Sequence, residues 1–135
     1  MPLLLDTTIL STHIKRPDLT FTRFITHGGQ LRTSQVVIGE LYAWAYLAKT
    51  AENQETRMKS IENLRSEVEV LQFDDECSRK FGELKVRIGT AAGSVDLMIV
   101  ATSIVHNAVI VSHDKDFFHL QRMIPELHVI DWLEG

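Results

Sequence analysis

The sequence predicts an α/β fold with a central, largely parallel β-sheet. Short apolar runs bounded by polar or charged residues alternate with longer segments of helical periodicity. Strands that alternate with helices are typical of parallel sheets flanked by helices. The 135 residues, 44% of them hydrophobic, fit a single domain over residues 1–135. A chain of this size buries roughly two-thirds of its unfolded surface.

Three strands and four helices are expected in the first half. Strands are predicted at residues 3–5, 30–33 and 68–71, and helices at residues 7–15, 18–28, 34–47 and 52–67. Pro17 ends the first helix because the residue before a proline avoids helical backbone angles. Asp18 and Ser34 are expected to cap the second and third helices.

The second half continues the alternation. Asp74 is expected to cap a helix that reaches residue 88, and residues 89–93 form a loop of small residues. The helix over 96–105 is apolar on most sides, which predicts burial, and Asn107 is placed to end it. Strands at 108–111 and 127–130 surround a helix at 115–123.

Four acidic residues lie at or near the boundaries of these elements. Asp6 and Asp114 each follow a predicted strand directly, and ligands of open parallel sheets bind beyond the carboxyl ends of the strands. Asp96 begins an apolar helix, and Glu40 lies within another, where an unpaired carboxylate is unfavourable. Magnesium is typically held by a few carboxylates, so the four acids predict a divalent-metal site. Asp116 is an alternative or additional ligand.

Each acid also has a simpler explanation. Asp6, Asp96 and Asp114 all lie where a carboxylate stabilises the start of a helix. Glu40 can lie on the exposed stripe of its helix. Both interpretations remain open at the level of sequence.

The ordered set of motifs resembles the PIN domain family. The motifs are LDT at residues 5–7, SQVVIGEL at 34–41, GSVDLMIVAT at 93–102, VIVSHDKDF at 109–117 and VIDWL at 129–133. A lone domain of this length resembles the VapC toxins of toxin–antitoxin pairs. The resemblance implies a PIN-like three-layer α/β fold.

The same resemblance implies a function and a set of partners. It implies an endoribonuclease that uses Mg²⁺ or Mn²⁺, is inhibited by a small antitoxin encoded nearby, forms a homodimer, and reaches operator DNA only through the antitoxin complex. Carried over by position, the metal ligands are Asp6, Glu40, Asp96, Asp114 and Asp116, with Thr7 and Ser112 supporting them. Many relatives have Asn where this chain has Thr8, whose hydroxyl retains the ability to hydrogen-bond. A catalytically inactive PIN-like binding module and a housekeeping RNA-processing nuclease are the alternatives.

Other chemistries lack their motifs. The six histidines and single cysteine show no zinc-site spacing, and no GxxxxGK(S/T) phosphate loop occurs. A haloacid-dehalogenase-type phosphatase needs a second Asp where Thr8 stands. His113 is expected at the rim of the acidic site, and Lys85 and Arg87 are candidates for positioning the RNA backbone.

Charge and composition limit the setting. The net charge of −4 argues against a general nucleic-acid binder but not against a nuclease rich in metal-binding acids. One cysteine and the lack of an export or membrane segment predict a cytoplasmic protein. Residues 41–48 are too uniformly apolar for one buried stripe, which predicts an exposed interface patch.

Overall fold

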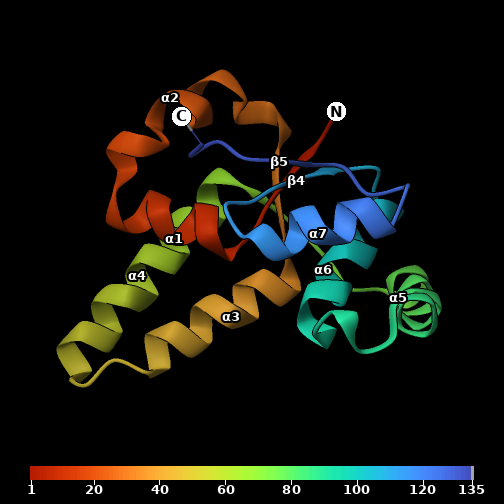
Figure 1. Ribbon diagram of the computed structural model, residues 1–135. Coiled ribbons are helices and arrows are strands. Elements are labelled where there is room, and N and C mark those ends of the chain that lie inside the picture. Colours follow the sequence, from red (N-terminus) through yellow and green to blue (C-terminus); the bar gives the residue numbers. More distant parts are fainter. Residues whose placement is uncertain (135) are drawn as a thin grey trace.

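The computed structural model describes residues 1–134, which form one five-stranded parallel sheet flanked by seven α-helices (Figure 1). The strands are β1 (Leu3–Leu5), β2 (Leu31–Ser34), β3 (Glu69–Leu71), β4 (Val109–Val111) and β5 (Val129–Ile130). The helices are α1 (Thr7–Lys15), α2 (Phe21–Thr26), α3 (Gln35–Tyr46), α4 (Ala51–Glu67), α5 (Asp75–Ile88), α6 (Ser94–Val105) and α7 (Lys115–Met123). The predicted α/β class and parallel sheet are confirmed.

The strand order β3-β2-β1-β4-β5 determines where a ligand site can form. The chain runs outward from β1 through β2 to β3, and then returns to place β4 on the other side of β1. Leu3 is in register with Val109 and Leu5 with Val111, so the carboxyl ends of β1 and β4 are adjacent. The order reverses between these two strands, and such a switch point is the usual ligand site of an open α/β sheet.

The core lies around the central strands and α6. Leu4, Leu5 and Ile110 are fully buried, as a strand with neighbours on both sides requires. Leu97 and Val100 of α6 are also completely buried, which confirms the burial predicted for this helix. The start of α6, which carries Asp96, is therefore anchored by its own apolar residues.

Side-chain caps begin several helices at their predicted positions. Ser34 Oγ accepts a hydrogen bond from the Val37 amide at 3.0 Å, and Asp74 Oδ1 accepts one from the Cys77 amide at 3.0 Å. Each cap satisfies one of the free amides at a helix N-terminus. Asn107, the second residue after the end of α6, adopts the left-handed region with φ of 51°.

The cap predicted at Asp18 is wrong. Pro17–Leu19 form a short 3₁₀ turn, and α2 begins only at Phe21, without a side-chain cap. The Asp18 carboxylate instead pairs with Arg16, with Nη2 and Oδ2 3.0 Å apart. A nearby guanidinium therefore competes successfully with the helix amides for this carboxylate.

Helices α3 and α4 form a hairpin that extends to one side of the sheet (Figure 1). Leu41 and Ala45 are buried, whereas Tyr46 is 67% and Leu47 78% exposed. The end of α3 therefore presents the exposed apolar patch predicted from residues 41–48. No helix within residues 1–134 is both long and apolar enough to cross a membrane.

Candidate active site

Asp6 lies at the centre of the site, between the carboxyl ends of β1 and β4. Its side chain is 2% exposed and caps α1 by accepting a hydrogen bond from the Ile9 amide at 3.2 Å. Thr8 Oγ1 donates to Asp6 Oδ1 at 2.6 Å, and Ser112 Oγ donates to Asp6 Oδ2 at 2.5 Å. The capping role and a role in the acidic site are therefore compatible in one residue.

The hydrogen bonds leave a defined part of Asp6 free. Burial raises the pKa of the Asp6 carboxyl, while the bonds from Ser112, Thr8 and Ile9 counteract that rise. Oδ1 already accepts two hydrogen bonds, whereas Oδ2 accepts one. A carboxylate oxygen has about two acceptor positions, so Oδ2 retains one for a further ligand.

Two hydroxyl groups connect β1 to the segment that follows β4. Thr8 Oγ1 donates to Asp6 and accepts a hydrogen bond from the His113 amide at 2.9 Å. Ser112 Oγ donates to Asp6 and accepts one from the Asp114 amide at 2.9 Å. Each hydroxyl acts both as donor and as acceptor. Ser112 and Thr8 therefore both hydrogen-bond the Asp6 carboxylate.

Glu40 reaches the site from α3. Thr7 Oγ1 donates to Glu40 Oε1 at 2.6 Å, which connects the first turn of α1 to the middle of α3. Glu40 is exposed, so the carboxylate is not buried among the apolar residues of its helix. Its second oxygen, Oε2, has no hydrogen-bond partner among residues 1–134.

The electrostatics of Asp96 show that the acids lie together. Burial at the start of α6 raises the pKa of Asp96 to about 6, and repulsion by other carboxylates adds to this rise. The contributing carboxylates, in decreasing order, are those of Asp114, Asp116, Glu40 and Asp6. The five predicted acids therefore lie close enough to interact electrostatically, although among residues 1–134 no three of them bring their carboxylate oxygens within 4.8 Å of one another.

Asp114 and Asp116 have different structural surroundings. Asp114 caps α7, and its Oδ1 accepts a hydrogen bond from the Asp116 amide at 2.9 Å. Asp116 lies in the first turn of α7 and lines a cleft of about 300 Å³ together with Asp96 and His119. The side chain of Asp116 therefore faces the same space as that of Asp96.

The two basic residues predicted to position the RNA backbone, Lys85 and Arg87, have different surroundings. Arg87 pairs with Glu83 and with Glu126, the latter at 3.0 Å, and is engaged away from the acids. Lys85 donates to Ser94 Oγ at 3.3 Å, near the start of α6.

Helix α7 instead presents Lys115, His119 and Arg122, which line a second cavity of about 450 Å³. Their spacing of four and three residues places them on one helix face, a signal that is present in the sequence. His119 also lines the first cleft, so the two cavities are adjacent. His113 is exposed, as expected for a rim residue, and its Nδ1 lies 2.8 Å from Asp131 Oδ2.

Comparison with known protein families agrees with this arrangement. The family model described as "PIN domain" matches residues 3–123, which contain the whole acidic cluster. The chain belongs to the PIN domain family.

Individual PIN domains are similar along nearly the whole chain. "Ribonuclease VapC2" of Haemophilus influenzae is 29% identical over 115 residues, which cover 82% of this chain and 85% of that protein. The solved VapBC2 of Rickettsia felis, bound to a DNA fragment from its promoter, superposes with a TM-score of 0.84 at 25% identity, covering 98% of this chain and 99% of that one. VapBC-1 of nontypeable H. influenzae gives 0.81 at 26% identity, covering 99% and 100%.

Proposed function

We propose that this PIN domain is a metal-dependent endoribonuclease and the toxin of a type II toxin–antitoxin pair. The observation that carries the proposal is that four other carboxylates lie near Asp96, whose pKa is raised to about 6 by burial and further by repulsion from those four. The proposed metal ligands are Asp6, Glu40, Asp96 and Asp114, with Asp116 beside them. Similarity to proteins named ribonuclease VapC supports RNA as the substrate.

The donor set fits Mg²⁺ or Mn²⁺. All the donors are oxygens, which these hard cations prefer, and a bound cation relieves the repulsion among the carboxylates. Unshared acceptor positions remain on Asp6 Oδ2 and Glu40 Oε2. A divalent ion in such a site supplies an activated water and stabilises charge on a phosphoryl group.

The protein's own contribution is to hold the donors in place. Ser112 orients Asp6 from the end of β4 and Thr8 orients it from the first turn of α1, while Thr7 orients Glu40. Because each of these hydroxyls bonds a carboxylate within 2.6 Å, the donors are positioned before any ligand arrives. Such preorganisation reduces the free energy needed to arrange the site during the reaction.

The RNA is proposed to cross the cleft along α7. Lys115 and Arg122 line the second cavity, which adjoins the cleft of Asp116 at His119. Their positive charges can neutralise backbone phosphates on either side of the cleaved bond. Phe118 lines the same cavity and offers a surface for an unpaired base, which suits single-stranded or looped RNA.

The test is RNA cleavage by the purified chain with Mg²⁺, with Mn²⁺ and with EDTA. We expect cleavage with either ion, none in EDTA, and none for Asp6→Asn or Asp96→Asn. The matched control is Glu55→Gln, an exposed acid of α4 that pairs only with Lys59 at the surface. Full cleavage in EDTA, or unchanged cleavage by both folded Asn variants, would contradict the assignment.

The proposed protein partner is a small antitoxin encoded nearby. The solved relatives described as VapBC are toxin–antitoxin complexes, and one of them is bound to DNA. By analogy, this chain is proposed to form a homodimer, to act in the cytoplasm, and to reach operator DNA only through the antitoxin. The exposed Tyr46 and Leu47 at the end of α3 offer an apolar surface for such contacts.

A further inference from the structure

A second group of metal-ligand side chains lies at the other end of α6 from Asp96. Asp74 precedes α5, Cys77 lies in the first turn of α5, and His106 directly follows α6. His106 lies ten positions after Asp96, which corresponds to about 15 Å at the helical rise of about 1.5 Å per residue. This group is therefore distinct from the acidic cluster.

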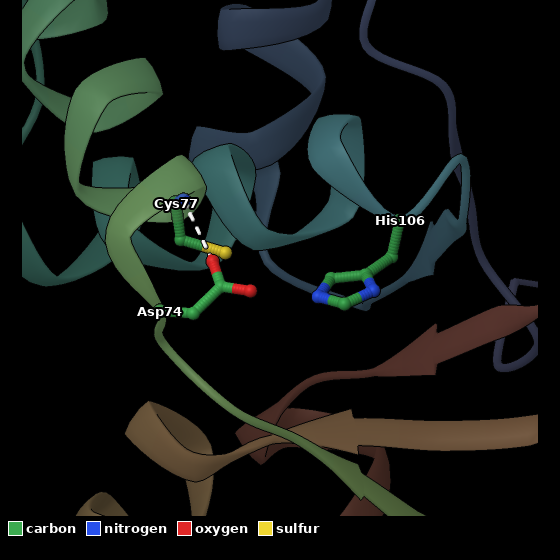
Figure 2. A group of neighbouring side chains, drawn as sticks. All are labelled: Asp74, Cys77 and His106. Carbon is green, nitrogen blue, oxygen red and sulfur yellow. Dashed lines mark hydrogen bonds between the residues drawn. The ribbon is translucent and has the colours of Figure 1, made fainter.

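The three side chains converge on one point. A carboxylate oxygen of Asp74, the sulfur of Cys77 and a ring nitrogen of His106 all lie within 4.8 Å of one another. Figure 2 shows the imidazole reaching from the end of α6 toward the carboxylate and the sulfur at the start of α5. The hydrogen bond from the Cys77 amide holds Asp74 in this orientation at 3.0 Å.

An unsatisfied atom faces this point. His106 Nε2 is buried and has no hydrogen-bond partner among residues 1–134. It is the ring nitrogen farther from the backbone, which Figure 2 shows on the side toward Asp74. A buried polar nitrogen without a hydrogen-bond partner is unfavourable, so His106 Nε2 can gain from a ligand at this point.

Cys77 adds a soft donor to the group. Its side chain is fully buried, and its thiol donates a weak hydrogen bond to the Gln72 carbonyl oxygen at 3.7 Å. One thiolate, one imidazole and one carboxylate form a ligand set that suits Zn²⁺ and is unlike the all-oxygen set preferred by Mg²⁺.

We propose that Asp74, Cys77 and His106 bind a Zn²⁺ ion, with water as the fourth ligand. Binding displaces the thiol proton to solvent and gives His106 Nε2 the partner that it lacks. The ion connects the start of α5 to the end of α6, the helix whose other end carries Asp96. The sequence did not predict this site because Cys77 and His106 belong to no recognised zinc motif. The proposal does not depend on ribonuclease activity.

The experiment is a Zn²⁺ titration by competition with a chromogenic chelator, in the Asp96→Asn background so that the acidic cluster is weakened. We expect one Zn²⁺ per chain. Cys77→Ser and His106→Gln each remove a direct ligand of the ion. Each is therefore expected to weaken Zn²⁺ binding by more than the roughly 10–100-fold that follows from losing a residue that hydrogen-bonds a ligand. His128→Gln, at an exposed histidine, is the matched control and should bind like the parent.

A second measurement identifies the ligands directly and does not require activity. Co²⁺ in place of Zn²⁺ should give thiolate-to-cobalt charge-transfer absorption that Cys77→Ser removes. Asp74→Asn retains the helix cap and should still lower the affinity, which separates ligation from folding. Three results would each overturn the proposal. They are the absence of Zn²⁺ binding, binding by Cys77→Ser and His106→Gln that is as tight as that of the parent, and Co²⁺ binding without the thiolate band.

Discussion

Asp6 is the helix cap and also a proposed metal ligand, two roles that the sequence presented as alternatives. It caps α1 by accepting from the Ile9 amide with Oδ1, and its Oδ2 accepts from Ser112. Both are possible because the carboxylate has more acceptor positions than the cap requires. At such a position, good capping sequence is therefore no argument against a functional role.

Ser112 provides a test of the orienting hydrogen bonds. Ser112→Ala is expected to reduce cleavage by about 10–100-fold, because Asp6 loses the donor that orients Oδ2. The measurement is the cleavage rate under single-turnover conditions, with circular dichroism as a check of folding. Ser78→Ala, at an exposed serine of α5, is the control. A cleavage rate of Ser112→Ala equal to that of the parent would refute the orienting role.

The raised pKa of Asp96 predicts how stability depends on pH in the metal-free protein. Between the ordinary value of 3.8 and about 6, the folded state holds a proton on Asp96 that the unfolded state has released. The stability contributed by Asp96 is therefore present below this window and is lost as the pH rises through it. Asp96→Asn, which stays uncharged, should be more stable than the parent at neutral pH.

Urea denaturation in EDTA at several pH values measures this effect. The free energy of unfolding of the parent should fall relative to that of Asp96→Asn across the window. Glu55→Gln should follow the parent throughout. Parallel curves for parent and Asp96→Asn would show that folding does not raise the pKa of Asp96.

At the scale of elements, local signals succeeded where a side chain had no competing partner. Ser34 and Asp74 cap their helices as predicted, whereas Asp18 pairs with Arg16 instead. Ser34 is both the last residue of β2 and the N-cap of α3, and its side chain is buried. Water cannot replace a hydroxyl removed from such a site.

Ser34→Ala is expected to destabilise the protein by about 1 kcal/mol, because the Val37 amide loses its acceptor. Chemical denaturation gives the free energy of unfolding. Ser34→Thr retains the hydroxyl and is expected to lose less. If both variants were equally destabilised, packing at this junction rather than the cap would explain the loss.

At the scale of the whole molecule, α3 connects one of the proposed metal ligands to an exposed apolar surface. Glu40, in the middle of α3, faces the acids, and Tyr46 and Leu47 end the helix on an exposed apolar surface. A partner bound on this surface would lie on the same helix as a proposed metal ligand. Such an arrangement suits an inhibitor that acts near the acidic cluster.

Expression in cells tests the toxin assignment. The chain alone should arrest growth, and co-expression of the short neighbouring reading frame should restore growth and yield a stable complex. The Asp96→Asn variant should be harmless yet still bind that neighbour, which separates catalysis from binding. A harmless parent that nevertheless cleaves RNA in vitro would instead favour a housekeeping nuclease.

The sequence by itself determined the element order, most helix boundaries and the set of acids. These features depend on local periodicity, on capping groups and on short motifs such as those around Asp96 and Asp114, all of which are read within a few residues. The tertiary structure decided what depends on long-range pairing. Four contacts join segments that are brought together only by the fold: Ser112 with Asp6, the His113 amide with Thr8, Arg87 with Glu126, and Cys77 with His106. The physical reason is that strand order and helix packing set these distances, and neither is encoded in the spacing of the residues along the chain.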